Sequence, residues 1–99
     1  MQTTDAILST IRAHSSQLQA CGVSRIGVFG SASRGEMSPT SDVDILIDFQ
    51  EGKKTYKNFI RSTNTLEQAL QLPVDAVTAG SISPYIKPYI EKDIRYVQI

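Results

Sequence analysis

Residues 30–47 have the sequence GSASRGEMSPTSDVDILI, and the interpretation of the whole chain starts from this stretch. It follows a short apolar run, IGVF at residues 26–29, and opens with Gly30-Ser31. Its last part alternates apolar and polar residues, which is typical of a β-strand with one buried face. The alternation predicts a strand over residues 41–49, with Val43, Ile45, Ile47 and Phe49 on one face and Asp42, Asp44, Leu46 and Asp48 on the other.

The segments on either side predict further helices and strands. Residues 4–21 carry apolar residues at helical spacing, with Thr3 or Thr4 as N-cap and Gly22 as a stop. A helix that starts at Ser83-Pro84 is expected to run to about residue 92, although Pro88 can shift its start. Between these two helices we expect a strand at residues 25–29, one or two turns of helix at 31–37, a turn at 38–40, a helix at 56–70 and a strand at 74–78. After the second helix we expect a strand at residues 95–99.

The order αβαβαβαβ predicts an α+β protein, with a mixed β-sheet and helices packed on it. A length of 99 residues, 40% of them hydrophobic, suits one small core, so we expect residues 1–99 to form a single domain. Ten basic and ten acidic residues leave no net charge, which gives no general attraction to nucleic acid or to an anionic membrane. The chain has no membrane-length apolar run, no secretory-signal pattern and only one cysteine, so we expect a cytoplasmic protein.

Three aspartates are candidate metal ligands. Asp42 and Asp44 lie two apart on the expected strand, so their side chains project on the same face and repel each other. A divalent cation such as Mg²⁺ would relieve that repulsion, because it binds carboxylate oxygens and keeps positions for water and phosphate. If the strand at 74–78 lies beside this one, Asp75 adds a third carboxylate, which suits a two-metal site with Asp75 as general base. Asp48 lies farther along the strand, and we expect it to be solvated.

Gly30-Ser31 is a candidate phosphate-binding element. A glycine lets the backbone approach a phosphate closely, and N–H groups at the start of a helix are ready anion donors. The hydroxyl of Ser31 adds a further donor. Arg34 lies one turn later, where it can pair with a phosphate or with a neighbouring carboxylate.

Each feature also has an ordinary structural explanation. A single Gly-Ser is usually a turn, and a single Asp-x-Asp is usually a solvated strand end or a helix cap. A surface ion pair explains Arg34 almost as well as a phosphate does. The combination of strand, Gly-Ser, turn, Asp-x-Asp on a strand and a later strand aspartate is much rarer, and it favours the functional interpretation.

With these motifs, the sequence resembles the DNA-polymerase-β-type nucleotidyltransferase superfamily. The similarity rests on Gly30-Ser31, on residues 41–44 (SDVD) and on Val74-Asp75. The short length narrows it to the minimal nucleotidyltransferases (MNT), the antitoxins of HEPN–MNT toxin–antitoxin pairs, and it covers nearly the whole chain. Ser33 departs from the pattern, since many relatives have alanine there, but it leaves the three carboxylates intact.

The resemblance implies the two-layer nucleotidyltransferase fold and transfer of AMP from ATP, with two Mg²⁺ ions as cofactor. It implies that Gly30, Ser31 and Arg34 bind the nucleotide phosphates, and that Asp42, Asp44 and Asp75 are metal-binding and catalytic. The implied partner is a helical HEPN toxin, modified on a tyrosine. Two alternatives stay open: an antitoxin that acts by binding alone, and an enzyme that modifies a small molecule such as an aminoglycoside.

Overall fold

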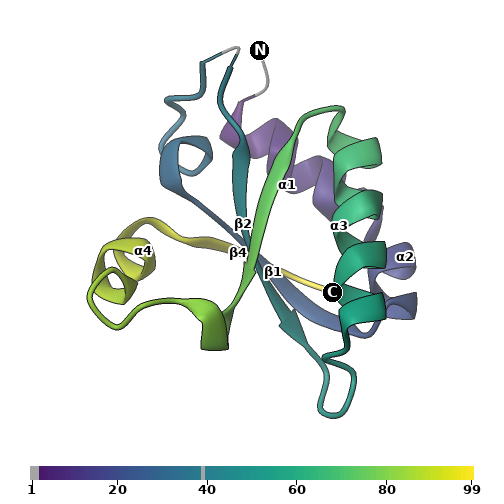
Figure 1. Ribbon diagram of the computed structural model, residues 1–99. Helices are drawn as coiled ribbons and strands as arrows, with labels where there is room; N and C mark the ends of the chain where they lie inside the picture. Colours follow the sequence, from purple (N-terminus) through teal and green to yellow (C-terminus); the bar gives the residue numbers. More distant parts are fainter. Residues whose placement is uncertain (1–2, 39) are drawn as a thin grey trace.

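A four-stranded sheet with the order β3-β2-β1-β4 forms the centre of the protein (Figure 1). The computed structural model describes residues 3–38 and 40–99. The strands are β1 (Val23–Phe29), β2 (Val43–Phe49), β3 (Val74–Thr78) and β4 (Arg95–Gln98). Strand β1 pairs antiparallel with β2 and β4, whereas β2 and β3 are parallel. The expected α+β class with a mixed sheet is confirmed.

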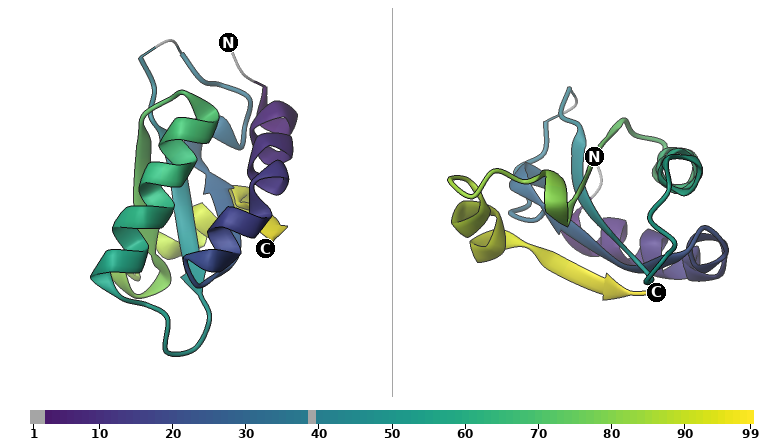
Figure 2. Two further views of the ribbon diagram at one scale, coloured as in Figure 1. Left: turned by 90° about the vertical axis from the view of Figure 1, so that its right-hand side faces the viewer. Right: turned by 60° about the horizontal axis from the view of Figure 1, so that its bottom comes forward.

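Within the described residues, α-helices cover both faces of the sheet, three on one face and one at the other (Figures 1 and 2). The first face carries α1 (Thr4–Ala13), α2 (Ser15–Ala20) and α3 (Tyr56–Leu70), and the short α4 (Lys87–Asp93) lies opposite. The core lies between the three helices and the sheet, as the apolar alternation of residues 43–49 predicts. Its fully buried side chains include Ile7, Ile11, Leu18, Ile26, Val28, Val43, Ile45, Ile47, Leu66 and Leu70.

The helix and strand expected at residues 56–70 and 74–78 have these same bounds in the structure. The single helix expected at residues 4–21 is instead broken into α1 and α2 at His14. There the backbone leaves helical geometry, and the ring Nδ1 lies 2.8 Å from the carbonyl oxygen of Thr10. The helix expected from Ser83-Pro84 begins later, at Lys87, so that Pro88 falls in its first turn, where a missing N–H has no cost.

The one or two turns of helix expected at residues 31–37 are shortened to a single turn of 3-10 helix, η1 (Gly30–Ala32). Gly35 explains the early end, because its φ of +70° lies in the left-handed region. The N–H of Glu36 then donates to the carbonyl of Ser31 at 2.9 Å, the hydrogen bond that closes a helix end of the Schellman type. Pro39, in the turn expected at residues 38–40, lies outside the described residues.

Asp48 is paired, although we expected it to be a solvated strand-end carboxylate. Arg25, its partner in the β1–β2 register, donates a hydrogen bond from Nε to Asp48 Oδ2. The guanidinium of Arg25 also lies 3.8 Å from the centre of the Tyr96 ring. Asp48 therefore belongs to an ion pair on the α4 side of the sheet.

None of the helices within residues 3–38 and 40–99 has the length and apolar character to cross a membrane.

Candidate active site

The candidate site lies at one end of the sheet, where β1 ends and where β2 and β3 begin. Asp44 in β2 is paired with Asp75 in the parallel strand β3, and on its other side it is paired with Phe29, the last residue of β1. Gly30 follows Phe29 directly, so the turn after β1 reaches the same place. The condition that the sequence left open, a strand carrying Asp75 beside residues 41–49, is therefore met.

The three aspartates lie on the same side of the sheet. Residues paired across neighbouring strands project to one face, which places Asp44 beside Asp75. Asp42 precedes Asp44 by two residues, just before β2 begins, so the strand alternation extends that face toward it. Asp42 and Asp75 are exposed, whereas Asp44 is half-buried. Behind them the fully buried Val43 and Ile45 fix the start of β2 in the core.

The carboxylates are near enough to affect one another. Partial burial raises the pKa of Asp44 above its ordinary value, and the negative charges of Asp75 and then Asp42 raise this pKa further. The positive charge of Arg34 acts in the opposite direction. Asp44 is thus a carboxylate whose charged form is only partly compensated by its surroundings, which is the condition that a bound cation relieves.

Gly30 and Asp44 are in close contact. Gly30 has a φ of +67°, a conformation that residues with a side chain rarely adopt. A Cβ atom added at Gly30 would overlap the Asp44 carboxylate, whose Oδ2 is the atom nearest to it. Glycine is therefore required here for two independent reasons, and the backbone after β1 passes directly against the central carboxylate of the site.

Ser31 begins a turn whose backbone is held from several sides. Its carbonyl accepts the N–H of Arg34 at 3.2 Å as well as that of Glu36. Within the described part of the chain, its hydroxyl makes no hydrogen bond, so it is available to a ligand. Because no α-helix starts at Gly30, the expected row of helix N-terminal amide donors is limited to a single 3-10 turn.

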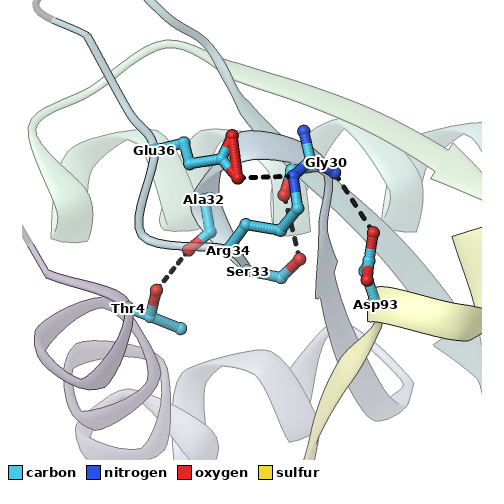
Figure 3. Close-up of polar contacts among 7 residues, drawn as sticks. All are labelled: Thr4, Gly30, Ala32, Ser33, Arg34, Glu36 and Asp93. Carbon is cyan, nitrogen blue, oxygen red and sulfur yellow. Dashed lines mark hydrogen bonds and ion pairs between the residues drawn. The ribbon is translucent and has the colours of Figure 1, made fainter.

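Two hydroxyl groups that sequence reasoning missed support this turn (Figure 3). Ser33 donates from Oγ to the carbonyl of Gly30 at 2.9 Å, and Thr4 donates from Oγ1 to the carbonyl of Ala32 at 2.6 Å. The second bond ties the turn to the start of α1. Thr4 appeared in the sequence only as a candidate helix cap, and the actual cap is Thr3, whose side chain accepts the N–H of Ala6.

Arg34 is held between two carboxylates (Figure 3). Its Nε donates to Glu36 Oε1 at 3.1 Å, and its Nη1 donates to Asp93 Oδ2 at 3.2 Å. Asp93 is the last residue of α4, so this ion pair connects the turn after β1 with the helix on the far face of the sheet. The side chain of Arg34 remains 43% exposed. Its expected contact with nucleotide phosphates stays a prediction.

The carboxylate oxygens of Asp42, Asp44 and Asp75 match the ligands that Mg²⁺ prefers. Gly30, which has no side chain, leaves room for the Asp44 carboxylate itself, and the neighbouring aspartates supply negative charge that a cation would neutralise. Among residues 3–38 and 40–99, no three His, Cys, Asp or Glu side chains are already gathered as a metal cluster. The three aspartates suit Mg²⁺ by the chemistry of their oxygen donors, and metal binding at this place stays a prediction.

Comparison with known proteins identifies the family. A family model described as nucleotidyltransferase domain matches residues 8–97. A Thermococcus cleftensis protein named protein adenylyltransferase MntA is 42% identical over 98 residues, which cover 98% of each chain. A relative from Methanocaldococcus jannaschii, provisionally named a protein adenylyltransferase, is 39% identical over 99 residues that cover 98% of this chain and 100% of the relative.

Solved structures agree with this fold. One that is described as a minimal nucleotidyltransferase superposes with a TM-score of 0.80 at 29% identity, over 95% of each chain. A crystal structure of a mutant MntA–HpeT toxin–antitoxin superposes with a TM-score of 0.64 over 96% of this chain and 72% of that one; at 19% identity it supports the fold alone. The resemblance expected from the Gly-Ser and Asp-x-Asp motifs is confirmed: the chain belongs to the nucleotidyltransferase-domain family, and it is a nucleotidyltransferase.

Proposed function

We propose that this protein is a magnesium-dependent adenylyltransferase that transfers AMP from ATP to a tyrosine hydroxyl of a partner HEPN toxin, and thereby acts as the cytoplasmic antitoxin of a type VII-like pair. Two relatives of nearly the same length carry the name protein adenylyltransferase. Two solved structures with this fold come from toxin–antitoxin proteins, and one of these was crystallised with the ATP analogue AMP-PNP. The names of the two relatives support adenylyl transfer by the present chain, and the two structures show that its fold occurs in toxin–antitoxin proteins.

The observation that carries the proposal is the pairing of Asp44 with Asp75 beside Gly30. Two carboxylates on adjacent parallel strands, with a third at Asp42, bring negative charges together, and Arg34 offsets them only in part. Next to it lies a backbone turn with a free serine hydroxyl. A cluster of carboxylates beside a turn that can bind phosphate is the arrangement that nucleotidyl transfer requires.

Each residue then has a role in the reaction. Gly30 and Ser31 bind phosphate oxygens through the backbone and the hydroxyl, and Asp42, Asp44 and Asp75 hold the metal. When bound, Mg²⁺ neutralises the charge of the triphosphate and stabilises the charge that develops during transfer. The acceptor oxygen forms a bond to the α-phosphorus while the bond to pyrophosphate breaks. Asp75, which is exposed at the start of β3, accepts the proton that the hydroxyl loses.

The acceptor comes from another molecule in this proposal. Asp42 and Asp75 are both exposed, so the site opens outward at the edge of the sheet instead of being enclosed by the described residues. An open site of this kind suits a hydroxyl on a protein surface. Tyr85 and Tyr89, which are 88% and 75% exposed on the segment that leads into and forms α4, are candidates to contact such a partner.

The test is the intact mass of the protein encoded by the neighbouring gene, which the proposal expects to be a HEPN toxin, after incubation of the two with ATP and Mg²⁺. We expect added mass in AMP units with the wild-type chain and none with Asp42→Asn. The control is Asp48→Asn, which removes a carboxylate of the same strand that is paired with Arg25 and does not belong to the site. This control should transfer AMP.

The other interpretations give different results in the same experiment. A stable complex without added mass, formed equally by wild type and Asp42→Asn, would overturn the proposal in favour of an antitoxin that acts by binding. Neither complex nor added mass would also overturn it and would direct attention to a small-molecule acceptor. Replacing ATP by the other nucleoside triphosphates in the same assay tests the choice of nucleotide.

A further inference from the structure

Glu67 makes an unusual connection at the end of α3. Its Oε2 accepts a hydrogen bond from the backbone N–H of Val74 at 3.1 Å, across the turn between α3 and β3. The carbonyl of the same residue accepts the N–H of Gln71 at 2.9 Å, and Gln71 has a left-handed φ of +56°. Glu67 thus holds both ends of this turn, one through its backbone and one through its side chain.

The position of the carboxylate is not explained by the helix itself. Glu67 lies one turn before α3 ends, where the partial negative charge of the helix C-terminus disfavours a carboxylate. The bond with Val74 supplies a different reason for the residue. A half-buried glutamate directed at a backbone N–H satisfies a donor that would otherwise face outward.

Val74 needs such an acceptor because β3 is an edge strand. The carbonyl of Pro73 accepts the N–H of Val43, so Pro73 faces β2 at this end of the ladder. Along a strand, successive backbone groups point to opposite sides, and the N–H of Val74 therefore points away from β2. Glu67 occupies this outer side, which also keeps another strand from pairing there.

The first pair of the β2–β3 ladder is Val43 with Val74, and the second is Asp44 with Asp75. A strand end that frays opens from its first pair, and Asp75 is the next residue to separate. We propose that Glu67 is a positioning residue for Asp75: by holding the N–H of Val74, it keeps Asp75 opposite Asp44. This inference rests on the proposed function, in which both aspartates belong to the metal site.

The first readout uses the metal-free chain. Backbone amide hydrogen exchange of Val74 and Asp75 is compared in wild type, Glu67→Ala and Glu67→Gln. We expect exchange to accelerate about tenfold or more in Glu67→Ala, since one hydrogen bond to a carboxylate is lost. In Glu67→Gln it should stay close to wild type, because the amide oxygen can accept the same bond. Gln68→Ala, at an exposed position one residue further along α3, is the matched control.

The second readout is Mn²⁺ binding, followed by paramagnetic broadening of the Asp44 and Asp75 amide signals. We expect Glu67→Ala to weaken Mn²⁺ binding about tenfold, because Asp75 is then held less firmly opposite Asp44, and Glu67→Gln to restore it. In AMP transfer, Glu67→Ala should lower kcat. The KM for ATP should change less than about twofold, because Gly30 and Ser31 are untouched. If Glu67→Ala does not fold, Glu67→Asp, whose shorter side chain falls short of Val74, takes its place.

The outcomes separate this inference from the proposed function. Unchanged exchange and Mn²⁺ binding in Glu67→Ala, with binding abolished by Asp44→Asn, would overturn the role of Glu67 and leave the metal site intact. Mn²⁺ binding that Asp44→Asn does not weaken would overturn the metal site, and the role of Glu67 with it. Loss in Glu67→Gln equal to that in Glu67→Ala would also contradict the inference, because the charge and not the accepted hydrogen bond would then matter.

Discussion

Gly30 and Asp44 are in contact across the turn that follows β1: the carboxylate of Asp44 fills the space where a side chain at position 30 would stand. Asp44 is the central carboxylate of the candidate site, between Phe29 of β1 and Asp75 of β3. The left-handed φ of Gly30 turns the chain at this point. The glycine of the Gly-Ser motif therefore shapes the proposed metal side of the site as well as the proposed phosphate side.

Gly30→Ala should damage both stability and activity. The left-handed backbone costs a residue with a Cβ about 1–2 kcal/mol, and the new methyl group must displace Asp44. We expect a loss of about 2–4 kcal/mol in the free energy of unfolding, measured in urea, and AMP transfer reduced about a hundredfold or more.

Gly52→Ala is the matched control for this change. Gly52 has a φ of +78°, and an added Cβ there would meet nothing within 4 Å. Gly52→Ala has the cost of the left-handed backbone without a contact like that between Gly30 and Asp44. We therefore expect a loss of about 1–2 kcal/mol in the free energy of unfolding and normal AMP transfer. Equal effects of the two variants on transfer would show that the contact with Asp44 has no importance for catalysis.

Asp44 predicts a pH dependence of stability in the metal-free protein. Burial and the charges of Asp75 and Asp42 raise its pKa in the folded state, so the folded protein binds more protons than the unfolded one above the ordinary aspartate pKa of about 3.9. The stability contributed by protonated Asp44 is complete below about pH 4 and is lost as the pH rises through the folded pKa.

Asp44→Asn should therefore raise the Tm in EDTA at neutral pH, and this gain should shrink as the pH approaches about 4. The measurement is thermal unfolding across that pH range, with Glu51→Gln in an exposed loop as the control for removing one negative charge. A variant that is less stable than wild type at neutral pH without metal would contradict the unfavourable environment assigned to the Asp44 carboxylate.

The parts of the fold that depend on local pattern could be predicted from the sequence. Alternation at residues 43–49 and helical spacing at residues 56–70 gave strand β2 and helix α3, because the periodicity of the apolar residues directly reflects which face is buried. The helix break at His14 and the short η1 turn were missed. In both places a hydrogen bond competes with regular helix geometry. At His14 it joins the ring to the carbonyl of Thr10, and after Gly35 it joins the N–H of Glu36 to the carbonyl of Ser31.

The candidate site could also be predicted only where local sequence pattern determines it. Asp42 and Asp44 stand out in the sequence because the strand pattern places them on one face, and the place of Asp75 depended on which strand would be the neighbour of β2. The contacts that hold the site join residues far apart in the chain, such as Thr4 with Ala32 and Arg34 with Asp93. Those pairs are set by the packing of the helices on the sheet, and no local pattern predicts them.

Arg25 should contribute to stability and leave catalysis unchanged. It pairs with Asp48 and stacks on Tyr96, and these contacts link three strands of the sheet on the α4 side. The pair is partly exposed, so we expect Arg25→Ala to lower the free energy of unfolding by about 0.5–1.5 kcal/mol with normal AMP transfer. Arg25→Ala, Asp48→Ala and the double variant form a thermodynamic cycle in urea. A coupling energy near zero would show that the ion pair contributes nothing.

The proposed role of Arg34 in binding phosphate can be separated from its role in structure. Nε and Nη1 donate to Glu36 and Asp93, while the half-exposed guanidinium retains the donors of Nη2 for a phosphate oxygen. We expect Arg34→Ala to raise KM for ATP about tenfold or more, as the loss of a charge-assisted hydrogen bond does. Arg61→Ala, at an exposed position on α3, removes the same charge and should leave KM unchanged.

Asp93→Asn then shows whether the ion pair holds Arg34 ready or competes with ATP for it. If the carboxylates orient the guanidinium toward the nucleotide, KM for ATP rises in Asp93→Asn, by less than in Arg34→Ala, and this is the result we expect. A lower KM in Asp93→Asn would mean that Arg34 has to leave Asp93 to reach the phosphates. An unchanged KM in Arg34→Ala would show that the arginine only ties the turn after β1 to α4, as the two ion pairs by themselves would allow.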